Sequence, residues 1–261
     1  MTTEERIQEI KTIGYTLDFS KVFTHAFENY KKIALYAGLV LLVFTIILGF
    51  TAGFGFVYAY GAENMNENWA KNYELRLLSN DNIAVYFLGS VLFTSLLSPF
   101  TAGFFKMAHC ADEDSEFHVA TFFEFYKPAY FVRIFATTFL ITFFTTGISL
   151  FCNKTGHPLL GALLNLPINF FTMLTIPLVI FGNLKALDAI KNSFMIIAKQ
   201  PMVILSLIIV AIIGACLGFI GCCIGILFTI PFIYSMNYAL YSEIVGFEEA
   251  QNQEEFDFTK N

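Results

Sequence analysis

The feature that most constrains this chain is a run of 43 residues, 200–242, without a single Asp, Glu, Lys, Arg or His. A bilayer core is about 30 Å thick, so a membrane-spanning helix needs about 20 apolar residues. The run is too long for one such helix and fits two. Glycines between positions 218 and 225 permit a tight turn near its middle. The run therefore predicts two spans, 202–220 and 223–243.

Four further stretches have the same character. Hydrophobic residues make up 56% of the chain and charged residues 14%, whereas a soluble domain carries about 25% charge. The other predicted spans are 34–60, 82–105, 134–151 and 158–181. The fold expected is all-α, a polytopic membrane helix bundle of about six spans. Prolines inside spans are tolerated when neighbours satisfy the freed carbonyls, and we expect helix kinks at Pro99, Pro177 and Pro231.

The chain divides into three parts by polarity. Residues 1–15 form a polar N-terminal segment, and residues 16–246 form a single six-span membrane domain. Residues 247–261 form an acidic tail that we expect to be disordered. No apolar segment precedes the first predicted span, so no cleavable signal peptide is expected.

The positions of Lys and Arg predict the orientation, because cytoplasmic loops carry an excess of positive residues. Six spans place both termini on one side, and that side collects twelve positive residues against three on the other. The twelve are Arg6, Lys11, Lys21, Lys31, Lys32, Lys106, Lys127, Arg133, Lys185, Lys191, Lys199 and Lys260; the three are Lys71, Arg76 and Lys154. Both termini are therefore predicted to be cytoplasmic.

A weak internal repeat accompanies the spans. An amphipathic stretch precedes each odd-numbered span, and a proline lies in each even-numbered span, which predicts three units of interfacial helix plus transmembrane hairpin. In the first unit an apolar stripe of helical period contains Phe19, Phe23, Phe27 and Tyr30. Such a helix is typical of the membrane interface. The alternative is a cytoplasmic helix that packs on another part of the protein.

Three segments together resemble a known family. They are Ile176-Pro177, the stretch 186–194, and the last hairpin from Ile230-Pro231 to Tyr241. They are similar to a broad bacterial family of six-helix inner-membrane proteins, which includes the membrane domain fused to some glycerophosphodiester phosphodiesterases. The resemblance covers residues 19–246 and implies a location in the bacterial cytoplasmic (inner) membrane. It supplies no catalytic residues, and it does not imply phosphodiesterase activity.

Polar residues inside the predicted spans are few. No ionisable residue lies in the middle of a span, whereas proton-coupled transporters generally need one. Asn165 and Asn169 are four residues apart and therefore share a helix face. They form either a polar site in the membrane or a bridge between helices. Asn237 has the same two interpretations.

One cluster has metal-ligand chemistry, namely His109, Asp112 and His118 at the end of the second span. No standard metal-site spacing fits it, and a solvated acidic loop is the simpler interpretation. The five cysteines show neither disulfide nor zinc spacing, and no cofactor is expected. A net charge of −6 without a basic stripe argues against nucleic acid as a partner.

Three functions are compatible with these patterns. The first is a non-enzymatic membrane protein that organises the bilayer or partner proteins, with membrane lipids and a membrane protein as partners. The second is a transporter or permease for a small or lipid-like substrate. The third is a membrane enzyme, which only the cluster around His109 supports.

Overall fold

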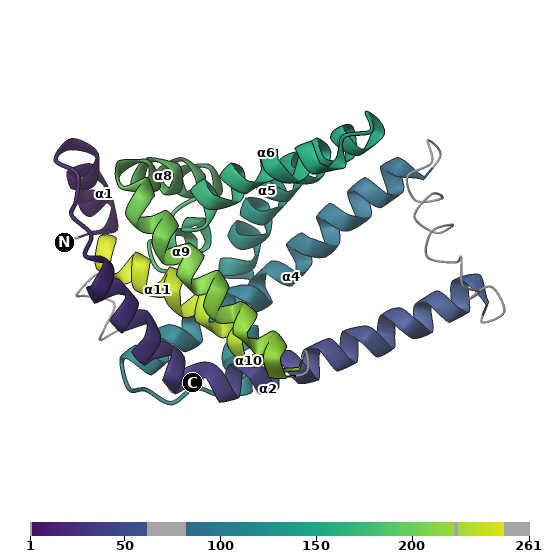
Figure 1. Ribbon diagram of the computed structural model, residues 1–261, viewed down its shortest axis with the longest axis horizontal. Helices are drawn as coiled ribbons and strands as arrows, with labels where there is room; N and C mark the ends of the chain where they lie inside the picture. Colours follow the sequence, from purple (N-terminus) through teal and green to yellow (C-terminus); the bar gives the residue numbers. More distant parts are fainter. Residues whose placement is uncertain (1, 62–81, 222–223, 248–261) are drawn as a thin grey trace.

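The computed structural model describes residues 2–61, 82–221 and 224–247, and every regular element in these ranges is helical (Figure 1). The all-α prediction is therefore confirmed for the described residues. The elements are α1 (Thr3–Thr12), α2 (Phe19–Tyr60), α4 (Ile83–Asp112), the 3₁₀ helix η2 (Val119–Tyr126), α5 (Pro128–Lys154), α6 (Pro158–Thr172), α7 (Thr175–Ile180), α8 (Ala186–Lys199), α9 (Pro201–Cys216), η3 (Leu217–Gly221), α10 (Gly225–Thr229) and α11 (Pro231–Ile244).

Five helical stretches are long and apolar enough to cross a membrane. They are Phe19–Gly55, Ile83–Asp112, Pro128–Lys154, Pro158–Ile180 and Pro201–Phe219. Their most apolar windows are mostly exposed: only 17% of the window in α2 and 11% of that in α5 is buried. Apolar surface on this scale is stable only against lipid or another protein. The described chain is a helical membrane bundle.

The sixth predicted span, 223–243, is divided in the structure. The helix is interrupted at Ile230, between α10 and α11, so neither piece is long enough to span a membrane by itself. The first residue of the predicted span lies outside the described residues. Gly218 and Gly225 meet at the turn, where a Cβ added at Gly218 would lie 2.6 Å from the Gly225 carbonyl oxygen. The predicted close turn therefore depends on residues without a side chain.

The predicted interfacial segment 19–30 is not a separate helix. It forms the first turns of α2, which continues as a helix to Tyr60 and changes direction along its length (Figure 1). By contrast, α5 and α9 each begin at a proline, after the non-helical residues Lys127 and Gln200. A proline disfavours the helical conformation of the residue before it. The first unit lacks such a proline, and its amphipathic stretch therefore runs directly into the apolar helix.

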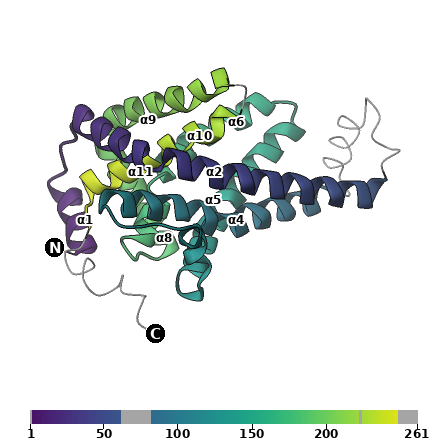
Figure 2. The same ribbon diagram turned by 90° about the horizontal axis from the view of Figure 1, so that it is seen from below.

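The centre of the bundle is α11, which packs against α2, α4, α7 and α9. Figure 2 shows α11 near α2 and α9, in the half of the molecule that contains α1. Its Phe232 receives the aromatic stripe of α2, with ring centroids 6.3 Å from Phe23, 6.3 Å from Phe27 and 5.2 Å from Tyr30. Part of the predicted interfacial stripe thus contacts the bundle itself. Phe19 and Phe27 stay about 40% exposed.

The three predicted kink prolines differ in their surroundings. The helix is interrupted just before Pro177, between α6 and α7, and again just before Pro231. At Pro99, α4 continues without interruption. Pro99 has no N–H for the carbonyl of Ser95, and the Ser98 hydroxyl donates to that carbonyl instead, at 2.7 Å.

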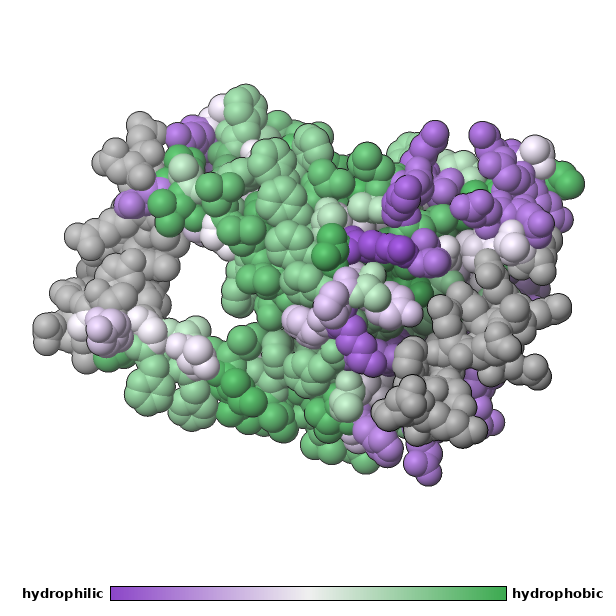
Figure 3. Space-filling view, turned by 180° about the vertical axis from the view of Figure 1, so that it is seen from behind, coloured by the Kyte–Doolittle hydropathy of each residue, from purple (hydrophilic) through white to green (hydrophobic). Residues whose placement is uncertain are grey.

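The molecule has two unlike ends. Hydrophilic residues gather at one end, which we call the polar end (Figure 3). There the start of α2 meets the ends of α4 and α11, with Lys32 paired with Asp114 (2.6 Å). Helix α1 lies against the ends of α11 and α8, where Arg6 Nε donates to the Ile244 carbonyl (3.1 Å) and Lys199 donates to the Lys11 carbonyl (3.1 Å). The polar segment 1–15 thus contains a folded helix, α1, whose Ile7 and Ile10 are buried.

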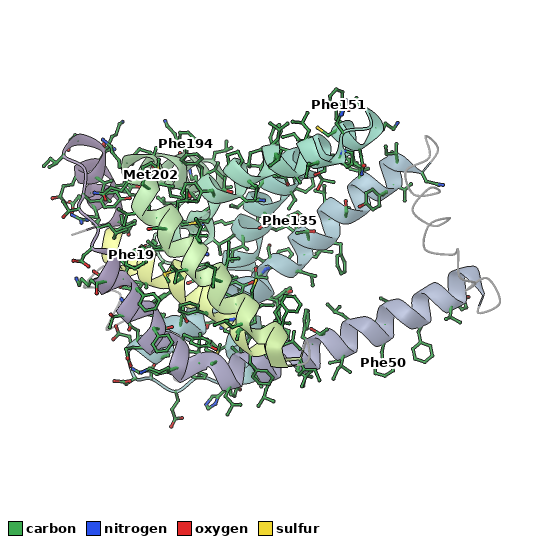
Figure 4. The ribbon with its side chains drawn as sticks, viewed as in Figure 1. Phe19, Phe50, Phe135, Phe151, Phe194 and Met202 are labelled. Atoms are coloured by element: carbon green, nitrogen blue, oxygen red, sulfur yellow. The ribbon has the colours of Figure 1, made fainter. Side chains whose placement is uncertain are left out.

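At the other end, residues 39–58 of α2 and 83–96 of α4 diverge, and we call them the outer arms (Figure 1). From Gly49 to Tyr58, every α2 residue whose side chain is described is exposed. In Figure 4, Phe50 projects from its arm away from the rest of the bundle. The α2 arm beyond Gly49 therefore offers apolar surface on all sides. In the α4 arm, by contrast, Val91 is buried and the Phe87 ring lies 5.0 Å from that of Phe143 on α5.

Candidate functional site

A partly buried polar network at the polar end joins three helices. Nδ1 of His109, on α4, lies 3.1 Å from the hydroxyl of Tyr238, on α11. The same hydroxyl donates to Oδ2 of Asp112, one turn further along α4, at 3.0 Å. Oδ1 of Asp112 lies 3.0 Å from Nε2 of His25, on α2. Because the single hydroxyl proton is directed at Asp112, this arrangement needs His109 to donate from Nδ1.

The spacing of residues along α4 produces one side of the network. Lys106, His109 and Asp112 are three residues apart and therefore lie along one helix face. Lys106 and His109 are each only 6% exposed, since α4 packs here against α11, α7 and η2. Ionisable groups this deeply buried are uncommon unless they have partners.

Asn29 of α2 extends the same junction toward the bundle centre. It is 2% exposed, and its Nδ2 donates to the carbonyl of Ala108 at 2.6 Å. Its Oδ1 accepts from the hydroxyl of Ser235, on α11, at 3.0 Å. One amide thereby connects α2, α4 and α11, which fixes their relative register at the polar end.

His25 faces acidic groups on both sides of its ring. Besides the contact of Nε2 with Asp112, its Nδ1 lies 3.4 Å from Oε1 of Glu243, near the end of α11. Glu243 also pairs with Lys21, one turn before His25 on α2, at 2.6 Å. The side chains of His25 and Glu243 are 19% and 17% exposed, so this is a partly buried charge cluster.

Aromatic rings cover His109. The ring of Phe247 lies 4.6 Å from it, centroid to centroid, and that of Phe181 lies 5.3 Å away. Gly246 adopts a φ of 77°, in the left-handed region, which lets the chain fold back over α11 so that Phe247 reaches this position. The rings limit the access of water to the His109 end of the network.

The three asparagines predicted as a polar membrane site occupy different places. Asn165, on α6, donates to the Thr145 carbonyl (3.0 Å) and to the Ser149 hydroxyl (2.7 Å), so it bridges α6 and α5. Asn169 is exposed on α6. Asn237 lies on α11 and is half-buried. No hydrogen bond in the described ranges joins any two of them.

The three metal candidates are also divided. His109 and Asp112 both belong to the polar network. His109 is buried, so the interpretation of this region as a solvated loop is wrong for His109, whereas Asp112 is exposed. His118 is exposed and lies 3.9 Å from Glu116. Among residues 2–61, 82–221 and 224–247, no group of three or more His, Cys, Asp or Glu side chains is placed to hold a metal ion.

The site residues predicted from the sequence do not include His25 or Asn29. The signal available was the spacing of Lys21, His25, Asn29 and Lys32, which follows the helical period beside the apolar stripe. A second stripe of this kind is typical of a helix that packs on two sides.

Fold and site together define a helical membrane bundle with a partly buried polar network at one end. Comparison with family models, curated proteins and solved structures produced no match. The function therefore has to be argued from the geometry alone.

Proposed function

We propose that this chain is a non-enzymatic integral membrane protein that organises the bilayer or partner membrane proteins from one membrane interface. The observation that carries this proposal is the two-sided surface of α8. Ala189, Ser193 and Ile196 of α8 are fully buried on the bundle, while Leu187 and Phe194 are 69% and 55% exposed.

The exposed residues of α8 divide into an apolar and a polar side. With about 100° per residue, Leu187 and Phe194 lie on one flank. Asp188 and Lys199 lie on the opposite flank, and Lys191 lies between the two. Figure 4 shows Phe194 at the outer edge of the molecule. A helix with one apolar face on the bundle, a second apolar flank and a polar flank is suited to the boundary between acyl chains and water.

The beginning of α2 supports the same location. Phe19 and Phe27 remain about 40% exposed although Phe23 packs on α11. The ammonium group of Lys31 lies 5.4 Å from the centre of the Phe27 ring. Lysines beside exposed rings would contact anionic headgroups, which contributes about 1 kcal/mol for each lysine that reaches the surface.

We further propose six spans, in which α10 and α11 together form the sixth, and both termini in the cytoplasm of a bacterial cell. The twelve-to-three distribution of positive residues supports this orientation. The element order supports three repeated hairpin units, and the resemblance to the bacterial inner-membrane family is part of the proposal. Labelling of single cysteines at Ser115 and Thr155 in sealed inside-out vesicles tests the orientation, since only Ser115→Cys should react.

The interfacial position of α8 is testable with two neighbouring probes. In a variant whose five native cysteines are replaced by alanine, Leu187→Cys and Asp188→Cys are each labelled with an environment-sensitive fluorophore and reconstituted into phospholipid vesicles. The probe at 187 should be quenched by nitroxide-bearing lipids, and the probe at 188 by aqueous iodide. The two sites differ by one residue and therefore serve as matched controls. Equal quenching of both by iodide would show that α8 stands clear of the bilayer.

A second candidate function is a permease, which one observation favours. Oδ1 of Asn165 and Oδ1 of Asn237 are buried without a hydrogen-bond partner among the described residues. Such acceptors can bind a polar group of a passing substrate. Translocation of a fluorescent phospholipid in proteoliposomes, measured by dithionite bleaching, separates the two functions. If the chain is a lipid permease, translocation should be faster than in protein-free vesicles, and Asn237→Leu should slow translocation. If the chain has the organising function, the translocation rate should equal that of protein-free vesicles.

A further inference from the structure

His25 is the one residue of the polar network whose two ring nitrogens both lie against carboxylates, and the carboxylates belong to different helices. Nε2 is 3.0 Å from Asp112 on α4, and Nδ1 is 3.4 Å from Glu243 on α11. The ring therefore lies between the ends of the two helices that flank the start of α2.

This geometry suits only one protonation state. A neutral imidazole has one N–H donor and one lone pair, whereas the imidazolium has two donors. Neutral His25 would direct a lone pair at one of the two carboxylates. Protonated His25 donates to both and partly neutralises two negative groups that would otherwise face the same space.

We propose that His25 is a proton-operated latch: its protonated ring ties the first turns of α2 to the ends of α4 and α11, and loss of the proton loosens α2 at that point. The stabilisation is present while His25 is charged and is lost as the pH rises through the value at which the ring gives up its proton. Acidic conditions therefore close the latch, and alkaline conditions open it. This inference concerns regulation and is independent of the proposed function.

The other charged groups around His25 have partners of their own. On α2, Lys21 pairs with Glu243 and Lys32 pairs with Asp114. On α4 and α11, Asp112 accepts from Tyr238, and neither carboxylates nor a tyrosine ordinarily titrates between about pH 5 and 8. His109 is the exception by residue type, and it contacts Tyr238 rather than His25.

A loosening of α2 at His25 can affect the rest of that helix. Helix α2 runs without interruption from Phe19 to Tyr60, so its anchored start and its outer arm are parts of one element. Since Phe19 and Phe27 are already partly exposed, release of the first turns would shift these rings further from α11 toward their surroundings. The latch thereby couples the pH at the polar end to the position of α2.

Hydrogen–deuterium exchange of the full chain in phospholipid nanodiscs tests the latch. Exchange in residues 19–30 is compared at about pH 6 and about pH 8, with times scaled for the intrinsic pH dependence of exchange. The wild-type protein should exchange about fivefold faster at the higher pH, the effect of losing one partly exposed ion-pair cluster. His25→Gln should show no such difference. His118→Gln, which replaces an exposed histidine at the same end, should behave as wild type.

Two outcomes would overturn the proposal: no pH effect in the wild-type protein, or an undiminished pH effect in His25→Gln, which would assign the effect to His109. Glu243→Gln provides a second variant if His25→Gln does not fold. It keeps a hydrogen-bond acceptor and removes one negative charge, so the opening of residues 19–30 should occur at a lower pH than in wild type. An unchanged midpoint in Glu243→Gln would also refute the latch.

Discussion

The polar end and the outer arms both consist of helices, but their side chains differ in how far they are buried by other helices. At the polar end Asn29 is 2% exposed, and Lys106 and His109 are each 6% exposed. In the outer arms, Phe50, Phe54 and Tyr58 of the same α2 helix are 66%, 75% and 95% exposed. A single helix is thus tightly packed at its beginning, whereas these three side chains near its end are exposed among the residues that the structure describes.

The difference shows what joins helices in a lipid environment. Lipid tails are as apolar as the side chains of the arms, so burial of Leu or Phe gives little driving force for association there. Helices are held where polar groups bond across them or where small residues allow close contact. Asn29, Tyr238 and Gly103 supply such contacts at the polar end. The described parts of the arms contain glycines too, but a Cβ added at Gly49, Gly53, Gly55 or Gly89 would meet no atom of another element within 4 Å.

The largest expected effect comes from two glycines of α4, one in each region. A Cβ at Gly103 would lie 2.5 Å from Cα and 2.9 Å from the carbonyl oxygen of Phe122, so Gly103→Ala must displace the η2 backbone. It should destabilise the fold by about 1–3 kcal/mol in detergent-denaturation titrations. A Cβ added at Gly89 would meet no atom of another element within 4 Å, and Gly89→Ala should be neutral or stabilise by up to about 1 kcal/mol. Equal effects at both sites would remove the distinction between the regions.

The next effect compares two asparagines. Asn29→Leu removes the hydrogen bonds to Ala108 and from Ser235, and it leaves a buried hydroxyl without its acceptor. The expected loss is about 1–3 kcal/mol in the same titration. Asn165→Leu removes bonds between two consecutive helices, α5 and α6, and should cost about 0.6 kcal/mol. A larger loss at Asn165 would locate the main polar connection outside the polar end.

A third prediction concerns one hydroxyl group. Tyr238→Phe removes the donor to Asp112 and the acceptor for His109 while keeping the ring, and should cost about 1 kcal/mol. Tyr126→Phe removes an exposed hydrogen bond to the Leu96 carbonyl and should change stability by less than about 0.5 kcal/mol. If the two variants were equally stable, the network would contribute no more than an exposed tyrosine.

The smallest effect is expected in the arms. Phe54 is 75% exposed, and Phe54→Leu exchanges one lipid-compatible side chain for another. Its effect on stability should stay within about 0.5 kcal/mol. Phe104→Leu, at a fully buried ring 4.7 Å from Tyr234 and 4.8 Å from Phe122, should cost about 1 kcal/mol. A substantial loss for Phe54→Leu would mean that the α2 arm has a protein partner in the membrane.

Much of the helical architecture was predictable because apolar length is a local property. The predicted span 134–151 lies within α5, and 82–105 lies within α4 except for its first residue. The predicted span 158–181 contains α6, the two residues that follow it, α7 and one further residue. The helix α1 was not predicted, although Thr2 and Glu5 form a reciprocal capping box that marks its start. The separation of segment 19–30 from the first span was also wrong, since no proline interrupts α2.

The sequence by itself determined that the chain forms apolar helices of membrane length, because periodicity and the absence of charge depend only on neighbouring residues. It did not determine which polar residues meet. His25, Asp112 and Glu243 come from three helices far apart in the chain, and only packing around α11 brings them within 3.4 Å. The same packing buries Asn29 and leaves Phe54 exposed, because contact in a membrane depends on complementary groups from other helices rather than on hydrophobicity.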